Sequence, residues 1–520
     1  MNRLTDRCFV FDLLVLAGLS LFWPGTSCAE PSQGGIAAQA PIPAVGRPHQ
    51  PNFLFILTDD QGYGDIGAHG HPLLKTPNYD KLHDQSVRFD NFCVSPSCSP
   101  TRAALLTGIH EFRNGVTHTL DPREHLWKGA TTLPQLLERS GYATGFIGKW
   151  HLSDERGYGP ASRGFQWCST NVGGPREHFD PVFVRNGKRT KEKGFREDIF
   201  FGDAIDFIRL DGTKPWFCYL ATYSPHDPLA APEEFIAPFR DKGLTEDQIL
   251  YLAMVENLDM NLGRIMKFLD ETEDPRWSGH KLRENTVIIL MNDNGATWGL
   301  DVFNAGMRGC KCTIWHGGSR AMSFWSWPGK WTPRSVDQLT AHLDVLPTIC
   351  QLADAPVPAE LQPQLEGYSL LPLLDGKGWS HDDRRLYQHV ARWPSGMAAD
   401  HKYAMAGVRQ GDFLLMRSRP CDRPDCTPEV RGDQCATLRA VEEGRKAAVY
   451  TQTNAPFHWG VTPPGQWALY DTRKDPACQT DLAASDPDRV KAMSAAYDQW
   501  WDEVYPVMIE RGGDAPLTKK

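Results

Sequence analysis

Four apolar runs along the chain each stop abruptly at a group of polar residues. In the first, Phe53 to Leu57, every side chain is apolar, and Asp59 and Asp60 follow after a single threonine. A short run of this kind is typical of a strand that is buried on both faces, as in a parallel sheet. The other runs lie within residues 141–151, 215–228 and 285–295, and they lead to Lys149, His226 and Asp293. The feature predicts several buried strands with polar residues at their carboxyl ends.

Helical patterns separate these runs. Residues 131–141 end in a glycine, and residues 246–271 carry apolar side chains at helical spacing. Strands that alternate with helices predict an α/β fold with a doubly wound, mostly parallel sheet. In such sheets ligands bind outside the carboxyl ends of the strands, so the polar residues after the four runs predict one composite site.

The pattern changes after about residue 380. Short strand-like pieces at 403–418 and 467–476 precede an amphipathic helical pattern near the C-terminus. With 520 residues, of which 41% are hydrophobic, the chain is long enough for two domains. We expect a catalytic domain over residues 51–380 and a smaller C-terminal α+β subdomain over residues 381–520, with a small antiparallel sheet and a closing helix.

The N-terminus has the features of a secretory signal peptide. Arg3 and Arg7 precede an apolar run, and small residues follow it. That run is too short and too interrupted for a membrane span. We expect a signal peptide over residues 1–29, a flexible leader over residues 30–50, and an exported protein that is periplasmic or extracellular. A lipid anchor on Cys28 is the alternative, and the residues before it fit that signal poorly.

Net charge and cysteine content limit the partners. The formal net charge of −9, with no basic stripe, disfavours a nucleic-acid partner. Of 13 cysteines, Cys8 and Cys28 lie in the signal peptide and 11 remain, an odd number for an oxidising compartment. Disulfides are expected in the C-terminal part, with the pairing left open, among Cys421, Cys426, Cys435 and Cys478.

Oxygen-bearing side chains at the predicted edge indicate a metal site. Asp59 and Asp60, with Asp293 and Asn294, follow two different strands, and neither pair includes a thiolate or an imidazole. Such a set suits a hard cation, calcium before magnesium. Either pair alone is equally well explained as a turn or a helix cap. Their occurrence at two equivalent strand ends favours the metal.

Cationic and titratable side chains are expected at the same edge, namely Arg102, Lys149, His151, His226 and Lys311. A lone lysine or histidine is more often a surface or core group, but several of them beyond consecutive strands form a pattern. Together with a dication they would bind a compact oxyanion and neutralise the charge of an ester in its transition state.

Cys98 lies where a helix is predicted to begin. Pro100 suits the first helical turn, and the residues up to Gly108 continue the helix. A helix N-terminus favours an anion, so one interpretation is a nucleophilic thiolate of low pKa. The alternative is a buried cysteine without a chemical role.

The residues that begin at Cys98 resemble a known family. The segment CSPTRAALLTG carries the Cys-x-Pro-x-Arg signature of the sulfatases, and the flanking motifs agree in order: TDDQGYGD, GKWH, SPHDP, NDNG and KCTIWHGGSR. The resemblance covers roughly residues 51–380, and LYDTRKDPACQTDLA at residues 469–483 is similar to the family's C-terminal subdomain. It implies an alkaline-phosphatase-like core and the activity of a sulfuric ester hydrolase.

The resemblance also implies that Cys98 does not act as a thiol. A maturation enzyme would oxidise it to formylglycine, which hydrates to a geminal diol. One hydroxyl would attack the sulfur and displace the alcohol, and the second would let the diol collapse to the aldehyde and expel sulfate. One calcium ion would be held by the modified residue 98 together with Asp59, Asp60, Asp293 and Asn294.

The same resemblance implies roles for the cations. Arg102 and Lys149 would hold the diol, and His151 would be the base that helps to break down the hemiacetal. His226 and Lys311 would bind the sulfate and protonate the leaving oxygen.

Substrate recognition is less clearly encoded. Arg176 and His178, in VGGPREHFD at residues 172–180, are candidate substrate-binding residues, and a solvated loop is the alternative. Family members usually have Glu where this chain has His316, which changes the charge near Lys311. His316 is a third candidate for substrate binding.

The chain is therefore expected to be an exported, calcium-dependent sulfatase that acts on sulfated carbohydrates. Its partners would be that substrate and a formylglycine-generating maturation enzyme, with no nucleic acid and no membrane span. A phosphate- or phosphonate-ester hydrolase of the same superfamily is the nearest alternative. A catalytically inactive glycan-binding relative is the alternative from another class, and the complete set of motif residues argues against it.

Overall fold

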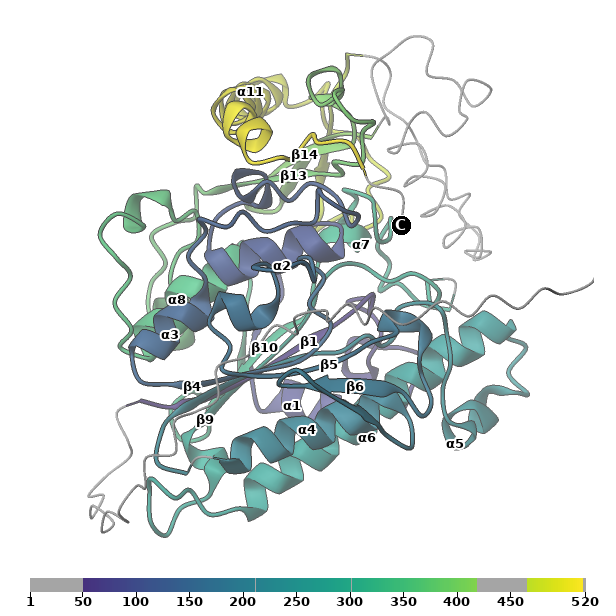
Figure 1. Ribbon diagram of the computed structural model, residues 1–520. Helices are drawn as coiled ribbons and strands as arrows, with labels where there is room; N and C mark the ends of the chain where they lie inside the picture. The colour runs from purple at the N-terminus through teal and green to yellow at the C-terminus, as the bar shows by residue number, and fades with distance from the viewer. Residues whose placement is uncertain (1–49, 211, 301, 419–464, 518–520) are drawn as a thin grey trace, which may run out of the picture. The chain divides into compact units, whose positions relative to one another are not determined.

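A ten-stranded sheet forms the centre of the computed structural model, which describes residues 50–210, 212–300, 302–418 and 465–517. In spatial order the strands are β11 (Arg334–Val336), β2 (Val87–Phe89), β10 (Ser323–Ser326), β9 (Thr286–Asn292), β1 (Asn52–Thr58), β8 (Trp216–Ala221), β4 (Ala143–Gly148), β5 (Trp167–Asn171), β6 (Val182–Arg185) and β7 (Lys188–Lys191). The strands from β9 to β5 run parallel, and β10 and β6 join them on either side in antiparallel pairing (Figure 1). The predicted mostly parallel α/β sheet is confirmed.

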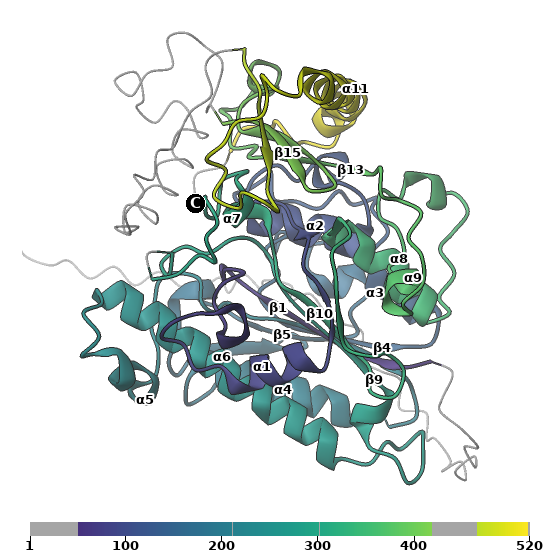
Figure 2. The same cartoon turned by 180° about the vertical axis from the view of Figure 1, so that it is seen from behind.

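Helices cover both faces of this sheet (Figures 1 and 2). One face carries α2 (Cys98–Thr107), α3 (Leu133–Arg139) and α8 (Val345–Leu352), and the other carries α1 (Pro77–Asp84), α4 (Arg196–Leu210) and α6 (Glu246–Glu271). Along β1, Phe53 and Phe55 belong to the core on the α2 side, whereas Leu54 and Ile56 belong to the core on the α6 side. Burial on both faces is the reason why β1 is apolar at every central position.

The elements predicted from the sequence are present, and several others were missed. The helix predicted over residues 246–271 is α6 with those bounds, and its capping box joins Thr245 and Gln248. The missed elements include α4 and the flanking strands. Short elements between the larger ones are β3 (Phe92–Cys93), α5 (Glu233–Ile236), α7 (His316–Ser319), β12 (Thr340–Ala341) and α9 (Leu371–Leu374).

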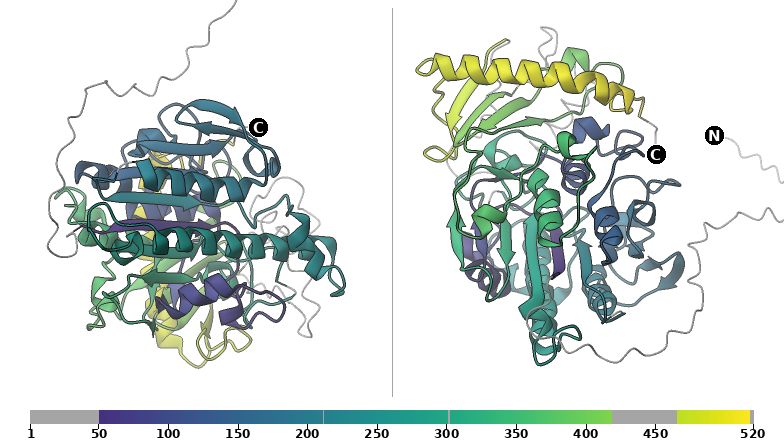
Figure 3. Two further views of the ribbon diagram at one scale, coloured as in Figure 1. Left: turned by 90° about the horizontal axis from the view of Figure 1, so that it is seen from below. Right: turned by 90° about the vertical axis from the view of Figure 1, so that its left-hand side faces the viewer.

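A second, four-stranded sheet follows residue 380 in the chain. Its strands are β13 (Arg385–His389), β14 (Ala406–Gln410), β15 (Phe413–Arg417) and β16 (Ala468–Asp471), and all neighbours are antiparallel. The long helix α11 (Pro487–Glu510) lies along this sheet (Figure 3), and its Trp501 joins Val408 and Leu415 in one apolar cluster. The predicted small antiparallel sheet is confirmed, and the domain boundary near residue 380 stays a prediction.

Some predictions fall outside the described residues. The signal peptide, the leader and three of the four C-terminal cysteines, Cys421, Cys426 and Cys435, are among them. The fourth, Cys478, is a buried free cysteine. None of the helices within the described ranges has both the length and the apolar character needed to cross a bilayer.

Gly148 tests the close packing at the end of β4. Its φ is 108°, and a Cβ there would lie 1.8 Å from the carbonyl oxygen of Ala221 in β8. Gly141 is a matched control, because its φ is 89° and nothing lies within 4 Å of an added Cβ. We expect Gly148→Ala to lower the free energy of unfolding by more than about 3 kcal/mol and Gly141→Ala by only about 1 kcal/mol, measured by urea denaturation. Equal losses would mean that the clash is relieved by a small strand shift.

Candidate active site

The carboxyl ends of four neighbouring parallel strands meet at one edge of the sheet. β9, β1, β8 and β4 are adjacent in that order. Asp293 and Asn294 follow β9, Asp59 and Asp60 follow β1, His226 follows β8, and Lys149 and His151 follow β4. The composite site predicted from the sequence is therefore assembled by the strand order.

The acidic residues of this edge form a connected, fully buried cluster. The backbone amide of Asp60 donates to Asp293 Oδ1 at 3.2 Å, and Asn294 Nδ2 donates to Asp60 Oδ1 at 2.8 Å. Asp60 has a φ of 63°, a left-handed conformation that the tight turn after β1 imposes. Asn294 Oδ1 is buried without a hydrogen-bond partner. A carbonyl oxygen left in this way beside carboxylates fits a cation ligand.

Cys98, the first residue of α2, points into the same cluster. Its Sγ lies 3.4 Å from Asp59 Oδ1 and 3.9 Å from Asp60 Oδ1. Ligand atoms of Asp59, Asp60, Cys98 and His226 all lie within 4.8 Å of one another. Burial raises the pKa of the Cys98 thiol well above its usual value, although two nearby lysines lower it. Burial therefore disfavours the ionised thiolate that the helix N-terminus was expected to favour.

Each buried carboxylate has its own cationic partner. Lys149 Nζ contacts Asp59 Oδ2, Lys311 Nζ lies 2.7 Å from Asp60 Oδ2, and Arg102 Nη2 lies 2.8 Å from Asp293 Oδ2. Burial acts to raise the pKa of Asp59, but Lys149, His226 and Arg102 hold it well below the usual range. Burial and the charge of Asp59 raise the pKa of Asp293 to about 7 despite Arg102, so the three carboxylates carry at most three negative charges against the three cations. A bound dication would therefore be balanced by the negative charge of an anionic ester and of an ionised nucleophile.

His151 is held in one tautomer from behind. Its Nε2 lies 3.3 Å from the Thr119 carbonyl oxygen, an acceptor that requires a proton on Nε2. The Glu124 carboxylate lies 3.4 Å from the same nitrogen but outside hydrogen-bond geometry, so its contribution is electrostatic. Its Nδ1 is buried without a hydrogen-bond partner. Burial and the charge of Lys149 hold the pKa of His151 well below its usual value. The ring is therefore neutral, with Nδ1 able to accept a proton.

His226 has the opposite arrangement. Its Nδ1 lies 2.5 Å from the carbonyl oxygen of Asp227, so Nδ1 carries the proton, and its Nε2 lies 3.7 Å from Asp60 Oδ2. Burial and the charge of Lys311 lower its pKa. The two histidines therefore turn different ring nitrogens toward this edge of the sheet, Nδ1 in His151 and Nε2 in His226.

The three residues predicted for substrate binding lie in different surroundings. Arg176 and His178 are in the loop after β5, whose carboxyl end lies beside that of β4. Arg176 is exposed, whereas His178 is buried next to the carbonyl of Pro228, and neither of its ring nitrogens makes a hydrogen bond of normal geometry. His316 is buried, and its Nδ1 contacts Arg409 rather than any residue of the acidic cluster.

Three residues at the site were missed by the sequence reasoning. Thr119 and Glu124 contact His151, and the hydroxyl of Tyr251 donates to the carbonyl oxygen of Asp60 at 2.9 Å. None of them belongs to a motif at a strand end, so no local sequence signal could have identified them.

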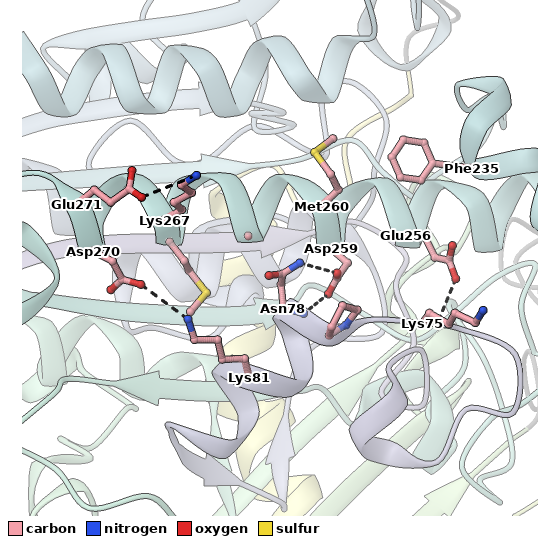
Figure 4. A pocket seen from close by; sticks show the side chains of 13 residues that line it. Lys75, Asn78, Lys81, Phe235, Glu256, Asp259, Met260, Lys267, Asp270 and Glu271 are labelled. Carbon is pink, nitrogen blue, oxygen red and sulfur yellow. Dashed lines mark hydrogen bonds and ion pairs between the residues drawn. The ribbon is translucent and has the colours of Figure 1, made fainter.

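A groove between α1 and α6 is separate from this chemistry. It has a volume of 760 Å³ and is lined by both signs of charge (Figure 4). Its charges largely pair with one another, as in Lys81 with Asp270 at 3.8 Å and Lys267 with Glu271 at 3.8 Å. None of the predicted catalytic residues lines it.

A doubly wound sheet that gathers carboxylates, lysines and histidines at the carboxyl ends of its central strands defines a hydrolase of anionic esters. The chain belongs to the sulfatase family, since the family's sequence model, described as Sulfatase, matches residues 51–355. Its activity is that of a sulfuric ester hydrolase.

Individual relatives agree with this membership. Human N-acetylgalactosamine-6-sulfatase is 31% identical over 376 residues, which cover 64% of this chain and 68% of that protein. The uncharacterized sulfatase YdeN of Escherichia coli is 29% identical over 519 residues, which cover 89% of this chain and 87% of that protein. The solved structure of Ps i-CgsB in complex with k-i-k-neocarrahexaose is similar in fold, with a TM-score of 0.72, 23% identity, and coverage of 91% of this chain and 95% of that one.

Glu124 tests the effect of the charge behind the His151 ring. Glu124→Ala removes the carboxylate 3.4 Å from Nε2, and we expect kcat to fall roughly tenfold with KM nearly unchanged, because the negative charge behind the ring, which would stabilise a proton taken up by His151, is lost. Asp121→Asn is the matched control on the same segment, since Asp121 Oδ1 pairs with His125 Nε2 at 2.7 Å. The kcat of both variants is measured by steady-state kinetics. An equal loss of kcat in Asp121→Asn would contradict the role of Glu124.

Proposed function

We propose that the protein is an exported, calcium-dependent sulfatase whose nucleophile is formylglycine made from Cys98. The observation that carries the proposal is the position of Cys98 Sγ, buried 3.4 Å from Asp59 Oδ1. A neutral thiol at this position is a poor nucleophile. An aldehyde hydrate in its place would bring two hydroxyls to the same carboxylates.

Asp59, Asp60, Asp293 and Asn294 are the residues that would hold calcium, together with residue 98. The unpartnered Asn294 Oδ1 and the all-oxygen character of these four side chains support a hard cation. When bound, the ion would act as a Lewis acid that lowers the pKa of a hydroxyl and neutralises charge on the ester.

The first chemical step transfers the sulfuryl group to residue 98. A hydroxyl of the diol that has already lost its proton to solvent attacks the sulfur as an alkoxide, a new S–O bond forms, and the S–O bond to the alcohol breaks. Lys311 gives a proton to the leaving oxygen, whereas His226, with its proton on Nδ1, could do so only after Nε2 takes up a second proton. Lys149 and Arg102 hold the diol in its attacking orientation, because both are themselves fixed by buried carboxylates.

The second step releases sulfate. His151 accepts the proton of the remaining hydroxyl at Nδ1, which has no other hydrogen-bond partner. The carbonyl double bond of the aldehyde forms as the C–O bond to sulfate breaks, and water then rehydrates the aldehyde. An ordinary serine ester would lack the second hydroxyl and would need an external water for this release.

We propose sulfated carbohydrates as the substrates. Human N-acetylgalactosamine-6-sulfatase is named for such a substrate, and one solved structure of similar fold (TM-score 0.62, 20% identity) holds D-Glucosamine-2-N, 6-O-disulfate. On this chain, the loop after β5 offers the exposed Arg176 for a second anionic group and Phe179, which is 52% exposed, for the apolar face of a sugar. His178 would support this loop against Pro228.

A phosphate- or phosphonate-ester hydrolase is the second candidate, because the same core and cations would serve either anion. Phosphate monoesters bring up to two negative charges and sulfate monoesters one, so a site tuned to one need not stabilise the other. A glycan-binding relative without activity is disfavoured, because binding alone gives no reason to bury Cys98 among carboxylates and lysines.

A matched ester pair tests the proposed function. On protein co-produced with a maturation enzyme, kcat/KM for an aryl sulfate or a sulfated saccharide should exceed that for the corresponding phosphate by roughly 100-fold or more, because the site is built for the sulfate transition state. Cys98→Ala should abolish turnover, and peptide mass analysis should find an aldehyde at residue 98. A preference for phosphate would support the second candidate, and full activity with an unmodified cysteine would refute the formylglycine mechanism.

Calcium dependence is tested by metal removal and by Asn294. Chelation should abolish turnover, and added calcium should restore it better than magnesium. Asn294→Ala should weaken calcium binding about tenfold or more in calorimetry, because a ligand oxygen is lost. Asn114→Ala is the control, since Asn114 is buried and its side-chain amide donates to Thr107 and Ile109 rather than to a residue of the acidic cluster. Full activity in the chelated protein would remove calcium from the mechanism.

A further inference from the structure

Arg409 is a buried cation without an acidic partner. It lies in β14 of the C-terminal sheet, fully enclosed, and within the described residues no carboxylate pairs with it. Its Nη1 lies 3.0 Å from His316 Nδ1, and its Nη2 donates to Asn91 Oδ1 at 2.9 Å. Its Nε has no hydrogen-bond partner. A buried guanidinium is costly unless its donors are satisfied, so these two acceptors matter.

His316 must act as the acceptor in this contact. Arginine only donates, so His316 Nδ1 accepts and the ring is neutral with its proton on Nε2. Burial, Arg409 and Arg320 together hold the pKa of His316 well below its usual value. The contact between Arg409 and His316 is called the arginine–histidine link below.

His316 begins α7, and Gly317 and Gly318, which follow it, are packed too closely against their neighbours to accept a Cβ. A Cβ on Gly318 would lie 2.1 Å from the carbonyl oxygen of Thr313 and 2.4 Å from that of Cys310. The amide of Gly295 donates to the Gly318 carbonyl oxygen at 3.1 Å. A shift of α7 is therefore transmitted to the segment 310–313 and to Gly295, the neighbour of Asn294.

The segment 310–313 carries Lys311 into the active site. The amide of Lys311 donates to the carbonyl oxygen of Ala296 at 3.2 Å, and that of Cys312 donates to the carbonyl oxygen of Pro96 at 2.7 Å. Lys311 Nζ then reaches Asp60 at 2.7 Å. Its backbone is thus fixed between the loop after β9 and the loop before Cys98.

We propose that the arginine–histidine link positions Lys311 and Asn294, so that the C-terminal sheet controls the geometry of the active site through α7. His316 is then a positioning residue and does not bind substrate. The proposal rests on the proposed function in so far as Lys311 acts on the sulfate ester.

Two substitutions of His316 distinguish the effect of its hydrogen-bond acceptor from the effect of its side-chain volume. His316→Asn keeps an acceptor near the position of Nδ1, and His316→Leu fills similar space without one. We expect His316→Leu to lower kcat/KM for an aryl sulfate about tenfold or more, since small displacements of a catalytic group are costly. His316→Asn should stay within about threefold of the wild type because it retains the acceptor. Equal kinetics of the two variants would overturn the proposal.

A second substitution separates positioning from stability. His316→Leu leaves the Arg409 charge without its acceptor and should lower the melting temperature, whereas the pair His316→Leu with Arg409→Met removes that charge and should recover it. The link is still missing in the double variant, so kcat/KM should remain low. Recovery of activity together with stability would mean that the two residues act on stability alone, and the proposal would be wrong. The double variant also serves if His316→Leu alone does not fold.

The crystal structure of the double variant gives a readout that does not need activity. Lys311 Nζ should be displaced from the Asp60 carboxylate, and an unchanged position would overturn the proposal. Wild-type turnover of the sulfate ester is measured first. Its absence would count against the proposed function, whereas the position of Lys311 still decides the role of the link.

Discussion

The pairing of three buried carboxylates with three cations, of which Arg102 and Lys149 are also buried, is the interaction on which the active site depends. Burying one such charge alone would cost several kcal/mol, of the order of a whole domain's stability. The parallel strands solve this problem by ending side by side, so that charges from distant parts of the chain neutralise one another: Asp59 with Lys149, Asp60 with Lys311, and Asp293 with Arg102. These pairs leave little uncompensated charge in the site before any ligand arrives, which favours electrostatic preorganisation.

The centre of the fold could be predicted from the sequence because its signals are local. β1 is apolar at every central position since both of its faces are buried, and α6 has a complete capping box and a long apolar stripe. The flanking strands could not be predicted in this way. β2 has three residues and β7 is exposed throughout, so neither carries a periodic pattern, and their pairing depends on partners far along the chain.

The same distinction holds for the candidate site. Residues that directly follow a strand, such as Asp60 and Lys149, could be assigned to one edge because topology alone brings them there. Glu124 and Arg409 could not, since each reaches a site residue through tertiary packing that no motif records. His316, a candidate for substrate binding because it departs from the family's usual Glu, has its Nδ1 against Arg409 of the C-terminal sheet, a contact that no motif records.

The pairing of β1 has a consequence for the order of events during synthesis. Asn52 pairs with Thr286 and Phe53 with Phe217, so β1 has no neighbour until most of the catalytic part of the chain has left the ribosome. The segment around Cys98 is buried in the folded protein, and it stays exposed to solvent until the strands and helices that cover it have formed. Under the proposed function, the late closure of the sheet would leave an interval in which a maturation enzyme could reach Cys98 before it is buried. The same long-range strand pairing that slows folding would then also set the time available for that proposed modification.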